Sequence, residues 1–228
     1  GQRDGLDNLP GLPEPHLAGH HRVPQQRVPV TAVQDVGHQQ PGCQGGHVHH
    51  WADLQRQELP HRRCAIGARS YAADPQRVAA LAAAFIRGMR ATDTRCCAKH
   101  WPGYGGVRPD PHRHVVRGTT SPSRWLKSDV PPFRAAVRAG ADALMTAHVI
   151  YPFLGKRPAT VNPRAYIRLR DPHLAGIRFE GPVLTDDLEM AGVAHLYPNA
   201  LGRLACDAIA AGADMVLVCG RPTSAVAA

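Results

Sequence analysis

From residue 66 onward, the sequence predicts an α/β fold in which strands alternate with helices. Three observations support this prediction. Short apolar segments alternate with segments whose apolar residues recur at helical spacing. Asp, Pro and Gly stand where helices would begin and end, and polar residues follow the apolar segments where strands would end. Alternation of this kind is typical of parallel strands joined by crossover helices.

The first helix is predicted to begin at Asp74-Pro75, because aspartate is favoured at the N-cap and proline at the first helical position. A single apolar face is predicted from residues at helical spacing, namely Val78, Leu81, Phe85 and Met89. A short strand over residues 94–98 follows and ends at Lys99-His100.

The later elements continue the alternation. Helices are predicted over 132–139, stopped by Gly140, over 164–170, and over 201–211, stopped by Gly212. Strands are predicted over 143–149, 181–185 and 215–219. An open doubly wound sheet and a (β/α)8 barrel both fit this order. No Gly-x-Gly-x-x-Gly and no phosphate-binding loop follows a predicted strand, so a nucleotide-binding sheet is not favoured.

Residues 1–64 differ sharply from the rest and are predicted to be separate from a domain at 65–228. They hold eight of the 14 histidines and nine of the ten glutamines, and no Ile, Phe, Tyr, Met, Lys or Ser. Such a segment buries too little apolar surface to offset the entropy of ordering it. Two interpretations stay open, a disordered segment and GC-rich DNA translated in the wrong frame. Cys43 with His47, His49 and His50 fits no structural zinc spacing.

The composition argues against several functional classes. The formal charge is +9, but only three of the 27 basic residues are lysines and the arginines are scattered, so nucleic-acid binding is not favoured. The six cysteines include no Cys-x-x-Cys pair, which predicts buried free thiols in a reducing compartment and a cytoplasmic location. No secretory leader and no apolar run of ~18 residues is found, so no membrane association is expected.

Polar side chains gather at the ends of the predicted strands. Arg69, Lys99-His100, His148 and Asp186 each follow an apolar or strand-like run. Charged groups at such positions need solvent or partners. In a β/α barrel, the carboxyl ends of the strands carry the active site. The recurrence of these residues therefore favours the barrel over the open sheet.

One stretch of the sequence resembles the signature of a known protein family. Lys-His-Trp-Pro-Gly-Tyr-Gly at residues 99–105, followed by Asp110-Pro111-His112, resembles the Lys-His-Phe-Pro-Gly-His-Gly … Asp-Ser-His signature of family 3 glycoside hydrolases. Within the family it is most similar to the bacterial β-N-acetylglucosaminidase, or β-hexosaminidase, branch. Similar segments follow in the family's order at residues 66–75, 129–134, 139–149, 184–190 and 211–219. The resemblance covers about residues 65–220.

The resemblance implies a barrel of the TIM type and a retaining glycosidase. It implies that Asp186 is the nucleophile that forms a covalent glycosyl-enzyme. It also implies that His112 and Asp110 form an acid/base dyad, since imidazole exchanges protons near neutral pH and aspartate orients the ring. Without the family resemblance, Asp186 would be interpreted as an ordinary helix-capping residue. The segment with Asp110 and His112 would be interpreted as a solvated loop.

Arg69, Lys99 and His100 match family positions that bind sugar hydroxyls and the acetamido group. The implied substrates are small carbohydrates, terminal β-linked N-acetylglucosamine of the muropeptide type. No metal, cofactor, nucleic acid or membrane is implied, and a monomer is expected. Whether water or phosphate accepts the glycosyl group stays open.

This sequence departs from the family in four places. Tyr104 replaces a histidine, Pro111 replaces a serine, residues 113–128 do not match, and the early Asp-Gln-Glu-Gly-Gly segment is missing. The matched region is also shorter than the ~250 residues of a typical barrel, so an incomplete barrel is expected. The alternatives are a catalytically inactive fragment, a basic sugar- or nucleic-acid-binding module and, less favoured, a β-glucosidase of the same family.

Overall fold

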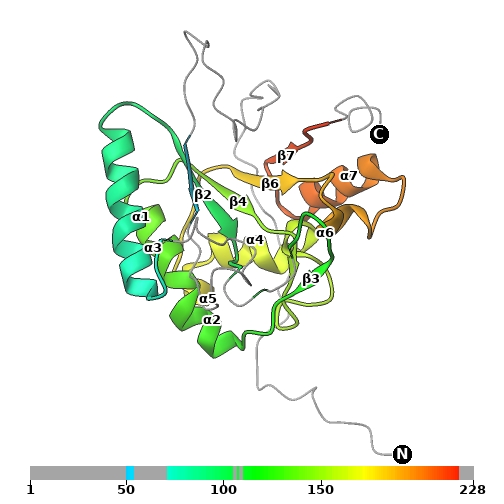
Figure 1. Cartoon of the computed structure of the whole chain (residues 1–228), viewed down its shortest axis with the longest axis horizontal. Coiled ribbons are helices and arrows are strands. Elements are labelled where there is room, and N and C mark those ends of the chain that lie inside the picture. Colours follow the sequence, from blue (N-terminus) through cyan, green and yellow to red (C-terminus); the bar gives the residue numbers. More distant parts are fainter. Residues whose placement is uncertain (1–49, 54–70, 105–106, 108–109, 221–228) are drawn as a thin grey trace, which may run out of the picture. The chain divides into compact units, whose positions relative to one another are not determined.

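The computed structural model describes residues 50–53, 71–104, 107 and 110–220 (Figure 1). All of them belong to one compact unit, Ala32–Ala228. Within these ranges, no helix is both long enough and apolar enough to cross a membrane.

Five parallel strands form the main sheet, and their order along the sheet follows their order along the chain. They are β1 (His50–Asp53), β2 (Cys96–Trp101), β4 (Ala143–Thr146), β6 (Val183–Asp187) and β7 (Met215–Leu217). A doubly wound sheet reverses its order at a switch point, whereas the strands of a barrel follow one another. The described strands therefore form part of a (β/α)8 barrel, and the open-sheet alternative is wrong.

Helices connect these strands. They are α1 (Pro75–Arg90), α2 (Pro122–Ser128), α3 (Val130–Arg138), α4 (Pro163–Arg170), α5 (Pro172–Ala175), α6 (Ala191–Ala194) and α7 (Leu201–Ala211), with a 3-10 turn, η3, at Ala159–Val161. The helix predicted over 132–139 begins two residues earlier, and those predicted over 164–170 and 201–211 are confirmed. α1 packs along α3, as Figure 1 shows.

β1 lies in the segment where the sequence showed no strand periodicity. It pairs with β2, from His50 beside Cys96 to Asp53 beside Lys99. Parallel pairing is made by main-chain groups, so four residues can join an existing strand without an apolar alternation. The remainder of residues 1–64 lies outside the described residues, and both interpretations of that segment stay predictions.

α1 begins as predicted, and three of the four residues predicted for its apolar face, Val78, Phe85 and Met89, contact the core. The Asp74 side chain accepts a hydrogen bond from the Arg77 N–H at 3.0 Å and caps the helix. Leu81, predicted to be in the core, is 40% exposed. Phe85 and Met89 pack at the edge of the core. The buried residues are mostly alanines, which allow close helix packing: Val78, Ala79, Ala82, Ala83 and Ile86.

The strands that carry the polar residues extend further than predicted. β2 includes Lys99 and His100, and β6 includes Asp186. Lys99 pairs with Met145 of β4, but His100 falls at a register shift between β2 and β4, and Asp186 falls at a register shift between β6 and β7. The polar residues therefore lie within the strands, at or beside irregularities in their pairing, instead of in loops after the strands.

The strand predicted over 143–149 is divided in two. β4 ends at Thr146, and β5 (Val149–Ile150) pairs with β3 (Val116–Arg117) in a separate small sheet. His148 lies between β4 and β5. Strands of two residues carry no detectable periodicity, so the apolar run appeared continuous in the sequence.

An aromatic cluster supports the end of β2. Trp101 packs edge-on against Trp125 of α2 and Phe133 of α3, with ring centroids 5.5 and 5.2 Å away. The Trp101 indole N–H donates to the Ala165 carbonyl at 2.9 Å. α2 was not predicted, although Ser121 before a proline is a typical helix start. These contacts fix the main chain next to Lys99-His100.

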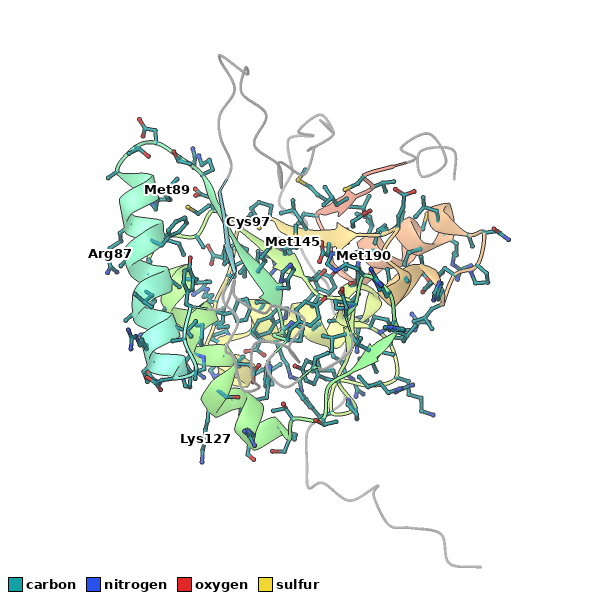
Figure 2. The ribbon with its side chains drawn as sticks, in the orientation of Figure 1. Arg87, Met89, Cys97, Lys127, Met145 and Met190 are labelled. Carbon is teal, nitrogen blue, oxygen red and sulfur yellow. The ribbon has the colours of Figure 1, made fainter. Side chains whose placement is uncertain are left out.

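The interior face of the sheet is filled by a small apolar cluster below the polar residues. Cys97, Met145 and Leu184 are buried together there, and Figure 2 labels the first two on neighbouring strands. Side chains two positions apart on a strand share a face. Lys99 and Asp186 therefore stand above Cys97 and Leu184, on the same side of the sheet.

The cysteine prediction holds only in part. Cys96 and Cys97 point to opposite faces of β2, and both are buried free thiols, as predicted. Burial raises the pKa of the Cys97 thiol. Cys206 and Cys219 are exposed, so the expectation of buried thiols is wrong for them. The exposure arises because Cys206 lies on the outer side of α7 and Cys219 follows the short strand β7. The other two cysteines lie outside the described residues.

Asp142 is a carboxylate whose interactions make the stability of the fold depend on pH in the acid range. It accepts hydrogen bonds from the Cys96 N–H at 2.8 Å, from Arg95 at 2.8 Å and from Arg90 at 3.2 Å. Burial alone raises the pKa of Asp142, but these partners outweigh it and the pKa is lowered.

We expect the Asp142 carboxylate to stabilise the fold at neutral pH and to lose this effect as pH falls, because the folded-state pKa lies below the unfolded one. Asp142→Asn should therefore lower the free energy of unfolding at pH 7 and have a smaller effect near pH 3. Urea unfolding followed by circular dichroism at both pH values measures this difference. A penalty independent of pH would contradict the prediction.

Candidate active site

The candidate site lies at the carboxyl ends of β2 and β6. His100 Nε2 is 3.5 Å from Asp186 Oδ2, and the two side chains are 6% and 15% exposed. Strand order leaves only β4 between β2 and β6, so the two side chains meet across it. The structure thus brings together two residues that are 86 positions apart in the sequence.

Asp186 is held as a carboxylate. Burial raises its pKa, but neighbouring positive charge, first of all that of His100, and the Asp187 N–H lower it overall. The Asp187 N–H donates to Asp186 Oδ1 at 3.0 Å. A mostly buried, ionised carboxylate is a nucleophile that needs no prior loss of a proton.

Asp110 and His112 form a hydrogen-bonded pair, as the sequence predicted. His112 Nδ1 is 2.7 Å from Asp110 Oδ1, which also accepts from the His112 N–H at 2.9 Å. Burial raises the Asp110 pKa, but the bonds from His112 and the charges of His112 and Arg113 lower it overall. An ionised carboxylate only accepts, so Nδ1 carries the proton and Nε2 is the exchangeable nitrogen.

The loop that carries this pair is attached to the segment after β6. The Gly192 N–H at the start of α6 donates to the Pro111 carbonyl at 2.8 Å, and the Ala191 N–H reaches the His112 carbonyl at 3.4 Å. A side chain at Gly192 would meet the Pro111 carbonyl at 2.6 Å, so only glycine permits this approach. The dyad and Asp186 are thereby tied to one β6–α6 connection.

His148, to which the sequence analysis gave no specific role, is fully buried beside this connection. Its Nε2 is 2.8 Å from the Asp187 carbonyl oxygen, and its Nδ1 is 2.6 Å from Thr160 Oγ1. Its main-chain N–H donates to the Tyr104 hydroxyl at 3.1 Å. Tyr104, which replaces the family's histidine, also packs against His100 with ring centroids 5.2 Å apart.

Arg69, predicted to bind sugar, lies outside the described residues, as do Cys43, His47 and His49. Among the residues that the structure describes, no three His, Cys, Asp or Glu side chains cluster closely enough to hold a metal ion.

Fold and site together define a class, that of β/α-barrel domains whose polar site lies at the carboxyl ends of parallel strands. The sequence profile described as the glycosyl hydrolase family 3 N terminal domain matches residues 57–228. The chain belongs to this family.

Individual relatives agree with this assignment. A protein named beta-hexosaminidase from Pseudomonas aeruginosa (strain LESB58) is 41% identical over 169 residues, 74% of this chain and 49% of the relative. The crystal structure of native NagZ from Neisseria gonorrhoeae matches with a TM-score of 0.65 at 34% identity, over 77% of this chain and 48% of that one. A family 3 beta-N-acetylglucosaminidase from Paenibacillus sp. str. FPU-7 matches with a TM-score of 0.69 at 30% identity, over 77% and 33% of the two chains.

The chain spans about half the length of the curated relatives that it matches. The resemblance drawn from the motifs and the expectation of a barrel are confirmed by these matches. The roles of individual site residues stay predictions.

Proposed function

We propose that this chain is the barrel domain of a retaining glycoside hydrolase that releases terminal β-linked N-acetylglucosamine. The observation that supports this most is the ionised, mostly buried Asp186 carboxylate beside His100, with the Asp110–His112 pair hydrogen-bonded to the connection that follows the same strand. The names of the relatives support N-acetylglucosamine as the sugar that is released.

In the first step, an Asp186 oxygen attacks the anomeric carbon while the bond from that carbon to the leaving oxygen breaks. His112, protonated on Nε2, gives this proton to the leaving oxygen. Asp110, hydrogen-bonded at Nδ1, stabilises the imidazolium before the transfer and orients the ring. The product is a covalent glycosyl-enzyme on Asp186.

In the second step, His112 is neutral and takes a proton from water as the water oxygen bonds to the anomeric carbon. The bond to Asp186 breaks and its carboxylate is restored. Two displacements on one carbon return the original configuration. Both steps use side chains and water only, so we propose that no cofactor is needed.

The proposed substrate-binding groups are hydrogen-bond donors of the site. We propose that Lys99, His100 and Arg69 bind the sugar hydroxyls and the acetamido group, since their N–H groups suit a ligand rich in oxygen. We further propose muropeptides as substrates, water as the acceptor, a monomeric enzyme and a cytoplasmic location.

The test is hydrolysis of p-nitrophenyl N-acetyl-β-D-glucosaminide by the full chain, with the first-formed anomer identified by proton NMR. We expect release of β-N-acetylglucosamine before mutarotation. Release of the α-anomer would overturn the retaining mechanism. No hydrolysis, together with saturable binding of N-acetylglucosamine, would overturn the enzymatic proposal in favour of a sugar-binding domain.

A further inference from the structure

One buried and hydrogen-bonded polar side chain near the site, that of His148, is not used by the proposed reaction. His148 is fully buried between β4 and β5, and each of its ring nitrogens contacts a different segment. Nε2 meets the carbonyl oxygen of Asp187, the residue directly after the proposed nucleophile, at 2.8 Å. A carbonyl oxygen only accepts hydrogen bonds, so Nε2 must carry a proton.

The other ring nitrogen then accepts. Nδ1 is 2.6 Å from Thr160 Oγ1, and the same hydroxyl lies 3.1 Å from the Ala147 carbonyl. The Thr160 hydroxyl has one hydrogen, so it donates a full hydrogen bond to only one of the two, His148 Nδ1 or the Ala147 carbonyl. Burial lowers the His148 pKa and outweighs the neighbouring Asp186 and Asp187 carboxylates, which raise it. The ring is therefore neutral, and the Thr160 hydroxyl donates to Nδ1 across the shorter distance.

The groups around His148 are themselves fixed. The Tyr166 hydroxyl donates to the Thr160 carbonyl at 2.7 Å, and the Tyr104 hydroxyl accepts from the His148 N–H. All four groups are buried. His148 is thus held at its main-chain N–H and at both ring nitrogens.

Asp187 transmits this orientation to Asp186. Its carboxylate Oδ1 accepts from the Glu189 and Cys219 N–H groups at 3.1 and 3.3 Å, and its own N–H donates to Asp186 Oδ1 at 3.0 Å. The carbonyl that His148 holds and the N–H that meets Asp186 belong to the same residue. Rotation of that residue would move both.

We propose that His148 is a positioning residue that, through the Asp187 main chain, aims the N–H group that orients the Asp186 carboxylate. This inference rests on the proposed role of Asp186 as nucleophile. It gives His148 a role without contact with the substrate.

Two variants of His148 separate positioning from packing. In His148→Gln the side-chain amide reaches the place of Nε2 and can still donate to the Asp187 carbonyl, whereas in His148→Asn it reaches only the place of Nδ1. We expect His148→Gln to keep kcat within about threefold and His148→Asn to lose on the order of 10²-fold in kcat with KM nearly unchanged. Equal losses in the two variants would overturn the proposal.

Two NMR measurements decide the inference even if the chain hydrolyses nothing. The ¹⁵N shifts of His148 should report the neutral Nε2–H tautomer, and a protonated Nδ1 would overturn the proposal. The Asp186 carboxyl, followed by ¹³C, should titrate at higher pH in His148→Asn than in His148→Gln, because a misaligned N–H stabilises the carboxylate less. Identical titrations would also overturn it. Loss of hydrolysis in the wild type with these NMR results intact would count against the proposed function alone.

Should His148→Asn fail to fold, Thr160→Val provides the second variant. It keeps the shape of the threonine and removes only the hydroxyl that donates to Nδ1. We expect a change in the same direction, a reduced kcat and a raised Asp186 titration. Thr160→Ser, which restores the hydroxyl, should return both to wild-type values, and no difference between these two variants would contradict the role of His148.

Discussion

Asp186→Asn is expected to lower kcat for aryl N-acetyl-β-glucosaminides on the order of 10³-fold or more. The amide has nearly the same size and can still accept the Asp187 N–H, so the fold should persist. It cannot form the glycosyl-enzyme, because an amide oxygen is a far weaker nucleophile than the carboxylate that the site keeps ionised. Steady-state hydrolysis with a thermal melt of each protein measures the effect.

Asp74→Asn is the matched control, since asparagine caps a helix as well as aspartate does and α1 begins far along the chain from β6. It should leave kcat unchanged. A second check uses Asp186→Ala with azide, which can enter the space left by the carboxylate and bond to the anomeric carbon as the leaving group departs. The product should be the α-glycosyl azide. Full activity in Asp186→Asn would show that another group is the nucleophile.

His112→Gln is expected to lose activity in proportion to how much the leaving group needs a proton. For a poor leaving group such as a sugar, kcat/KM should fall on the order of 10²–10³-fold, whereas the first step with an activated aryl glycoside should fall about tenfold or less. The physical reason is that a departing nitrophenolate is stable without protonation. Comparing a chitobiose-type disaccharide with the p-nitrophenyl substrate measures the contrast.

His114→Gln is the matched control for this loop, because His114 is exposed two residues further on. It should behave as wild type on both substrates. Asp110→Asn should show the same leaving-group dependence as His112→Gln but a smaller loss, since the amide still accepts a hydrogen bond without stabilising the imidazolium. Equal losses on the two substrates would indicate a role in binding and not in proton transfer.

The sequence was sufficient for features that depend on local chemistry. Asp74 before a proline located the start of α1, and the apolar runs before Lys99 and Asp186 located β2 and β6. What it missed depends on partners elsewhere in the chain. β1 exists through main-chain pairing with β2, and Leu81 is exposed because the buried face of α1 is formed mostly by alanines. Neither fact is visible in a hydrophobic pattern.

The candidate site shows the same division. The pairing of Asp110 with His112 follows from a spacing of two residues, which a sequence motif records well. The role proposed for His148 could not be read in this way, because its partners Thr160 and Asp187 lie 12 and 39 positions away and one of them is a main-chain carbonyl. A carbonyl group is common to every residue, so no sequence pattern marks it.

The contact between α6 and the dyad loop has a consequence for how freely the loop sequence can vary. α6 binds the carbonyl oxygens at positions 111 and 112 through its own N–H groups. A proline presents the same carbonyl as the serine that the family signature has at position 111. The attachment therefore tolerates exchange of the loop's side chains, whereas a single methyl group added at Gly192 would collide with it. The stability of this attachment should therefore be less sensitive to substitutions at positions 111 and 112 than to substitution of Gly192, although His112 is also a proposed catalytic residue.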